Sequence, residues 1–358
     1  MGTLTSFFGG GGGGVFLPHF ALTAFSGTWV ADLDGQVCVH VIGGGGAGIS
    51  SNDGTGGAAG GYTRKIFDVV SGDTFTYTTG RGGRSSSQAG LSSSFTNSSS
   101  ITLTANGGSG GSAGTDISPT GGTASGGDVN VTGGSAGSRA SGNQRTGGGA
   151  VGIFELDGGT GYSSGNVTTS SSTNHLTTGG AGVGGRSASV YGISTGQGGG
   201  SGGGGSGGPS LTPSDDNYRG TNVDVVFRGG PALISKPETC KNLFRFIPDF
   251  GKGGTTQILF TSSGKSASSE PAGIGGGGAS ASFRADGLFS GQDGGPFGGG
   301  GAGGDSRPGG NGGWGGGGGA GFAGTQVINY DAPGGFGSVT LSGGLGGPGI
   351  IFVEYLSA

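Results

Sequence analysis

Glycine makes up most of the stretch "GGAGGDSRPGGNGGWGGGGGAGFAG" at residues 300–324. Glycine loses more backbone freedom on folding than any other residue, and runs of it are usually flexible linkers. In the polyproline-II conformation, however, a chain makes no internal hydrogen bonds, so its N–H and C=O groups are free to bond to neighbouring chains. Several glycine chains can approach closely enough to do so because no Cβ stands between them. We therefore predict ordered polyglycine-II passes, bonded side by side, instead of a linker.

The composition of the whole chain supports an ordered lattice. Glycine accounts for 102 of 358 residues and proline for 12. So large a combined share of glycine and proline is typical of disordered chains when no triplet period is present. Only 10% of residues are charged and the net charge is −4, so self-repulsion does not hold this chain open. Apolar residues make up 30%, and no helical apolar period persists over ten residues. We predict an all-β protein with almost no helix, in which a β-strand domain built from both chain ends is combined with polyglycine-II passes.

Strand patterns are clearest near the two ends of the chain. Residues 37–42 alternate between two faces, with Cys38 and His40 on the same face. Residues 62–70 and 74–79 form two further predicted strands, joined by a Ser-Gly-Asp turn. The apolar run 350–355 is a closing strand, which we expect beside residues 37–42 because an exposed apolar edge invites aggregation. A packed or hydrogen-bonded role for His40 is favoured over a catalytic or metal-binding one.

Changes in composition divide the chain into five expected regions. They are an N-terminal arm (1–20), a β-strand domain (21–106), a polyglycine-II-like region (107–208), an inserted subdomain poor in glycine (209–262) and a glycine-rich region with a closing strand (263–358). The fourth region is rich in proline, charge and aromatic residues. This composition indicates a subdomain or a contact with a neighbouring chain.

Motifs that carry chemistry are not apparent in the sequence. The two cysteines, Cys38 and Cys240, make neither a disulfide framework nor a CxxC metal motif. Matches to GxGxxG lack the strand, helix and acidic residue that a dinucleotide site requires. The mildly acidic balance argues against general nucleic-acid binding. We predict a non-enzymatic protein with no catalytic residue, metal or cofactor.

Both ends of the chain resemble the glycine-rich domain of bacteriophage tail fibres and tail adhesins. The resemblance rests on "FSGTWV" (25–30), "VCVHVIGGGGAG" (37–48), "GGAAGGYTRKIFDVVSGDTFTYTTGRGG" (56–83), "SSFTNSSSITLTANGGSGG" (93–111) and "GFGSVTLSGGLGGPGIIFVEY" (335–355). Members commonly carry a proline after the first of these strands, where this chain has residues 31–34, so the entry turn differs. The middle of the chain is similar only in composition.

This resemblance implies a protein of the virion tail, either a tail fibre or a receptor-binding adhesin that contacts the host surface. Its partners would be other tail proteins and a host glycan or outer-membrane protein, with homo-oligomerisation possible. A purely structural tail or tail-tip protein is the alternative. An ice-binding polyglycine protein would need a flat face of small residues, and Phe297, Arg307 and Trp314 inside the glycine runs speak against it.

Aromatic residues supply the candidate contact sites. Isolated rings among glycines either pack on the next pass or contact the receptor. Receptor contact has a physical basis, because rings give a large contact area at little entropy cost. The receptor candidates are Tyr162, Tyr191, Phe297 and Trp314. Rings gathered in the arm and in the inserted subdomain indicate an assembly interface, since contiguous exposed apolar patches mark contact sites. The assembly candidates are Phe7, Phe8, Phe16, Phe227, Phe244, Phe246 and Phe250.

Overall fold

The structure, a computed structural model, contains β-strands and irregular segments. It describes residues 19–51, 53–140, 144–153, 155–167, 176–183, 185, 187, 224–227, 252–261, 264–272, 276–280, 290–303, 307–321, 326–330, 337–341 and 343–357. Within these ranges there is no helix, which confirms the all-β class. None of the described residues belongs to a helix that could span a lipid bilayer.

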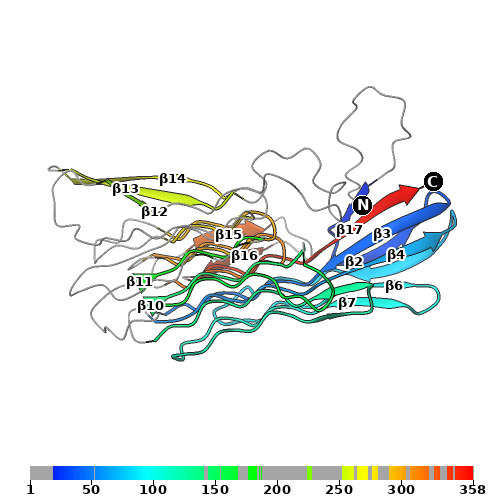
Figure 1. Cartoon of the computed structure of the whole chain (residues 1–358), viewed down its shortest axis with the longest axis horizontal. Helices are drawn as coiled ribbons and strands as arrows, with labels where there is room; N and C mark the ends of the chain where they lie inside the picture. Colours follow the sequence, from blue (N-terminus) through cyan, green and yellow to red (C-terminus); the bar gives the residue numbers. More distant parts are fainter. Residues whose placement is uncertain are drawn as a thin grey trace, which may run out of the picture.

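Two five-stranded antiparallel sheets form a β-sandwich at one end of the molecule (Figure 1). The first sheet, in spatial order, consists of β1 (His19–Leu22), β17 (Ile350–Ser357), β3 (Gly35–Ile42), β4 (Tyr62–Val69) and β9 (Val129–Val131). The second consists of β2 (Ser26–Val30), β5 (Thr74–Thr78), β6 (Ser93–Asn97), β7 (Thr102–Ala105) and β8 (Ala124–Ser125). Because β9 belongs to the first sheet, the sandwich extends beyond the boundary expected at residue 106.

Alternation along the strands directs apolar side chains into the sandwich. In β3, Val37, Val39 and Val41 are fully buried and meet Phe95 and Leu103 of the second sheet. The remaining members of this core are Trp29, Ala31, Phe67, Val69, Phe75, Ala105, Ile351, Val353 and Tyr355. Serine and threonine alternate with the buried residues in the second sheet, as expected of antiparallel strands with one face toward solvent.

The expected pairing of the closing strand with the first sheet is confirmed. Strand β17 is antiparallel to β3, from Ile350 opposite Ile42 to Tyr355 opposite Val37. Its other edge pairs with β1. An apolar strand at the end of the sequence therefore occupies an interior position in the sheet, where both of its edges are hydrogen-bonded.

Glycine-rich segments continue the hairpins of the sandwich outward as long passes (Figure 1). Strand β3 runs directly into 43–49, and the chain returns through 54–61 into β4. We use the term glycine-rich passes for residues 43–49, 54–61, 79–83, 88–92, 106–112, 120–123, 132–139, 144–151, 298–303, 309–321 and 343–349. Apart from the short strand β10 (Gln144–Arg145), these passes contain no strand, although they are largely buried.

Backbone hydrogen bonds join each pass to several others. In the pass 43–49, Gly43 and Gly46 donate to pass 54–61, Gly44 and Ala47 to pass 88–92, and Gly45 and Gly48 to pass 343–349, with N···O distances of 2.8–3.0 Å. Carbonyl groups of the same pass accept from passes 79–83, 106–112 and 309–321. Donors therefore change direction from one residue to the next and return after three residues. The expected lateral bonding of glycine-rich segments is observed, and their polyglycine-II conformation stays a prediction.

Smaller sheets lie along the glycine-rich part of the chain. One consists of β12 (Asp224–Phe227), β13 (Thr255–Thr261) and β14 (Gly264–Glu270), and the others pair β10 with β11 (Leu176–Thr177) and β15 (Gln326–Tyr330) with β16 (Gly337–Leu341). The β13–β14 hairpin crosses the boundary expected at residue 262. Glycine content changes there, but hydrogen bonds between these two strands continue across it.

Candidate functional site

Turns at the outer ends of the passes come together away from the sandwich. Ser50 donates its backbone N–H to the hydroxyl of Ser86, and its own hydroxyl accepts from the N–H of Gly343. Thr55, next to the first turn, donates its N–H to the carbonyl of Ser112. These contacts connect the turns 49–54, 84–88 and 112–118, which we call the loop cluster. Its exposed side chains are mostly hydroxyl-bearing or charged.

A shallow hollow adjoins the loop cluster and includes one receptor candidate. Tyr162 is partly buried and lines an open hollow of about 330 Å³. The other lining residues are Ser118, Ala136, Gly161, Ser163, Ser164 and Asn166. Its surface is mainly polar, so it offers hydroxyl and amide groups next to one aromatic ring. Such a lining suits a polar ligand, such as a sugar, better than an apolar one.

Two other receptor candidates pack on the sandwich. Phe297 is fully buried, with its ring centroid 5.8 Å from that of Trp314 and 6.1 Å from that of Phe352. A ring without exposed surface cannot contact a receptor, so this assignment of Phe297 is wrong and its ring packs against the neighbouring pass and β17. Trp314 is partly buried in the same cluster. Tyr191 lies outside the described residues.

The assembly candidates fall mostly outside the described part of the chain. Phe227 ends β12, opposite Thr256 of β13. Phe7, Phe8, Phe16, Phe244, Phe246 and Phe250 lie outside the described residues. The described sandwich presents a different apolar surface at the end remote from the loop cluster, where Val30, Leu33 and Val70 are 45%, 38% and 62% exposed. The backbone bonds between Ala31 and residues 72 and 73 hold the loops that carry them together. We call these three residues the apolar tip.

A buried polar cluster lies on the outer face of the first sheet. Cys38 and His40 come from β3, and Glu354 stands opposite Cys38 in β17. Their exposed fractions are 4%, 1% and 4%. His40 places Nε2 3.2 Å from Oε1 of Glu354 and Nδ1 2.9 Å from the hydroxyl of Tyr62. The thiol, imidazole and carboxylate each offer an atom within 4.8 Å of the others, so this group could hold a metal ion.

Opposing influences set the pKa of His40. Burial alone would lower the pKa, but hydrogen bonds to Cys38 and Glu354 and electrostatic interaction with these groups raise it from 6.5 to about 9. Glu354 could not be identified from the sequence as a partner, since 314 positions separate it from His40. Only the alternation that places Cys38 and His40 on one face was visible.

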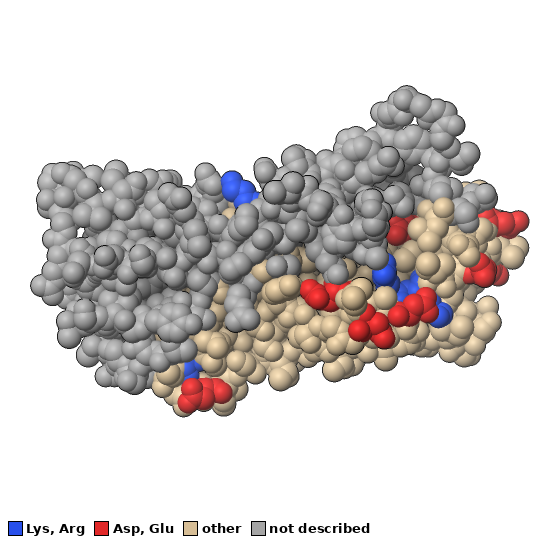
Figure 2. All heavy atoms as spheres, in the orientation of Figure 1, with Lys and Arg blue, Asp and Glu red and all other residues tan. Residues whose placement is uncertain are grey.

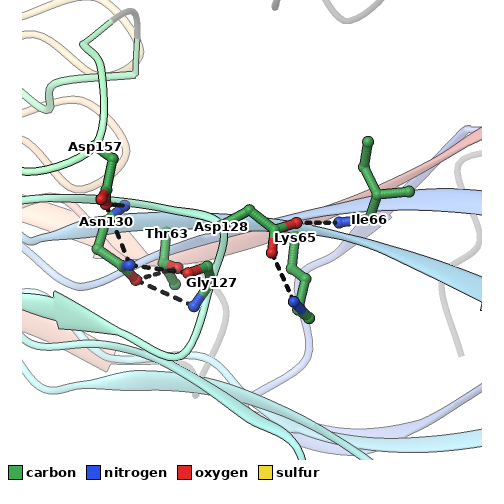
Figure 3. A network of polar contacts seen from close by, with 7 residues as sticks. All are labelled: Thr63, Lys65, Ile66, Gly127, Asp128, Asn130 and Asp157. Atoms are coloured by element: carbon green, nitrogen blue, oxygen red, sulfur yellow. Dashed lines mark hydrogen bonds and ion pairs between the residues drawn. The ribbon is translucent and has the colours of Figure 1, made fainter.

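A second polar network joins the edge of the first sheet to the adjoining turns (Figure 3). Lys65 of β4 lies 2.6 Å from Oδ1 of Asp128, whose Oδ2 accepts the N–H of Ile66. Asn130 accepts from the hydroxyl of Thr63 and donates its backbone N–H to Asp157. The hydrogen bond from Lys65 is the main cause that lowers the pKa of Asp128. This network holds β9 and the turn before it against β4, and we assign it a structural role.

Charge is sparse over the glycine-rich part. On the face in Figure 2, charged side chains gather over the sandwich with acidic and basic groups side by side, and the described glycine-rich surface shows few. No basic patch that would suit nucleic acid is visible among the described residues on this face.

Comparison with known proteins found no matching family model and no matching curated protein.

Proposed function

We propose that this chain is a non-enzymatic component of a bacteriophage tail, a fibre or receptor-binding adhesin located in the virion. The proposal rests on the resemblance of both chain ends to tail-fibre glycine-rich domains. The observation that carries it is the hydrogen-bonded array of glycine-rich passes that extends the sandwich. Buried backbone groups pair with one another there, as buried polar groups must. An array of this kind gives an extended, stiff body, as a tail fibre requires.

We further infer that the passes are polyglycine-II helices. Support comes from the alternation of hydrogen-bond partners with a period of three in the pass 43–49. A helix with three residues per turn directs successive N–H groups to successive neighbours in this way. The glycine-rich body would then be a bundle of parallel and antiparallel helices joined through their backbones.

The two ends of the described structure suit different contacts. The apolar tip offers apolar surface, which favours burial against another tail protein. The loop cluster and the hollow at Tyr162 offer polar groups and one ring, which suit a host glycan or an outer-membrane protein. In this arrangement the sandwich attaches to the particle and the passes carry the loop cluster toward the host.

Phage particles with altered chains test the proposal. Val70→Asp at the apolar tip should give particles that lack the protein, as seen by immunogold electron microscopy. Thr115→Arg combined with Ile117→Arg, both exposed in the loop cluster, should leave incorporation intact and lower adsorption to host cells at least tenfold. Thr76→Arg, exposed on the side of the sandwich, is the matched control. Absence of the protein from unaltered particles would overturn the proposal, and normal adsorption of the loop variant would show a purely structural tail role.

A further inference from the structure

Three side chains of different chemistry converge on the outer face of the first sheet. Cys38 and His40 are two positions apart in β3 and therefore point to the same side of the sheet. Glu354 is directly opposite Cys38 in the neighbouring strand, so its side chain belongs to that side as well. The thiol sulfur, imidazole nitrogen and carboxylate oxygen all lie within 4.8 Å of one another, and all three residues are buried.

A hydrogen bond to the second ring nitrogen fixes the orientation of the imidazole of His40. Tyr62 of β4 lies opposite Ile42 in the ladder, and its hydroxyl is 2.9 Å from Nδ1 of His40. Nε2 is therefore the nitrogen that faces Glu354. Histidines that bind metals through one nitrogen use the other for a hydrogen bond of this kind, which sets the tautomer and the ring orientation. Tyr62 supplies that support here.

We propose that Cys38, His40 and Glu354 bind a divalent metal ion of the zinc class. Sulfur, nitrogen and oxygen donors together suit zinc, and tetrahedral zinc has bonds of about 2.0–2.3 Å, so its ligand atoms lie about 3.3–3.8 Å apart. The distance of 3.2 Å between Nε2 of His40 and Oε1 of Glu354 is already close to that spacing. Calcium and magnesium, which require oxygen ligands, are excluded by the donor set.

Charge balance at this place is compatible with a divalent ion that displaces the proton from His40. A thiolate and a carboxylate together carry two negative charges, and a divalent cation with a neutral imidazole leaves no net charge. Neutrality is important because an uncompensated charge in a buried layer is costly. A singly charged ion would leave one negative charge buried, and a trivalent ion one positive charge.

A nucleophilic cysteine site does not fit the same geometry. In such a site the histidine contacts the nucleophile with one nitrogen and the orienting carboxylate with the other. Here the hydroxyl of Tyr62 occupies Nδ1, so Nε2 alone is left to face both Cys38 and Glu354. Burial of Cys38 also keeps its sulfur away from solvent. The arrangement therefore suits a structural ion and not a covalent intermediate.

The proposed ion would join the two ends of the sequence. Cys38 and His40 lie in an early strand and Glu354 in the last, so the site exists only after β17 has paired with β3. Metal binding that requires the folded state stabilises that state by mass action. The fourth position would belong to water. The inference is independent of the proposed role in a phage tail.

Metal content and spectroscopy test the site in a Cys240→Ser background, which leaves Cys38 as the single cysteine. Protein purified without chelators should contain about one zinc per chain by elemental analysis. Cobalt exchange should produce a sulfur-to-cobalt charge-transfer band and the visible bands of tetrahedral cobalt. Cys38→Ser should remove the charge-transfer band, and Glu354→Gln should weaken binding at least tenfold.

A control variant separates ligand loss from general damage to the sheet. Ile66 stands opposite Cys38 in β4 and is 48% exposed, so Ile66→Ala changes the same face without touching a donor atom. It should keep full metal content. For the unaltered protein, the thermal midpoint should rise with free zinc and fall on chelation. Absence of stoichiometric metal together with a midpoint insensitive to zinc would overturn the inference, even if the ligand variants fail to fold.

Discussion

At Gly317 the neighbouring backbone leaves no room for a side chain. A Cβ on this residue would overlap the carbonyl oxygen and carbon of Gly57, which belong to an adjacent pass and cannot rotate away. The N–H of Gly57 also bonds to Gly318, so separating the passes would break lateral hydrogen bonds. We expect Gly317→Ala to lower the free energy of unfolding by about 3 kcal/mol or more, near the upper end of single-site effects. Chemical denaturation monitored by circular dichroism measures this loss.

Gly114 provides the matched control for this substitution. A Cβ at Gly114 would first meet the terminal methyl of Ile117, an exposed and flexible side chain that can move aside. Gly114→Ala should therefore change the free energy of unfolding by less than about 1 kcal/mol, as is usual for surface sites. Equal losses in the two variants would show that close approach of the passes does not stabilise the fold.

Among the elements, the ion pair between β4 and the turn before β9 gives a pH-dependent prediction. The pKa of Asp128 is lowered in the folded protein, so the pair stabilises the fold above the unfolded pKa of about 3.9 and is lost as the pH falls through the lower folded value. Asp128→Asn should cost at most about 1 kcal/mol at pH 7, because the carboxylate is largely exposed. The difference between the two proteins should shrink below about pH 4. A difference that is constant from pH 7 to pH 3 would show that charge is not involved.

How far the elements could be predicted depends on whether their signals are local. Alternation from Val37 to Ile42 and the apolar run at Ile350 indicated two strands, and protection of an apolar edge indicated their pairing; the structure confirms all three points. Glu354 was missed as the partner of His40 because register between distant strands follows from closure of the whole sheet. Phe297 was wrongly assigned to receptor contact for a related reason. Whether an isolated ring is covered depends on the pass that lies next to it. Glycine runs carry no side-chain pattern from which the neighbouring pass could be identified.

On the scale of the whole molecule, the passes and the sandwich should unfold as one unit. Most of the passes continue a sandwich strand, and the pass 43–49 bonds to six others, so opening it separates groups throughout the array. The amides of Gly45, Gly46, Gly318 and Gly319 are hydrogen-bonded at 2.8–2.9 Å and buried. Local opening would leave these polar groups without partners, at a cost that favours global unfolding instead.

Hydrogen exchange measured by mass spectrometry or NMR tests this cooperativity. Amides of the pass 43–49 should exchange as slowly as those of β3, with opening free energies close to that of global unfolding. Residues 98–100, exposed in the turn between β6 and β7, should exchange rapidly and serve as the internal control. If the passes exchange at the rate of this turn while β3 remains protected, the array opens independently of the sandwich. It would then be too weakly held to act as the stiff body on which the proposed role in a phage tail depends.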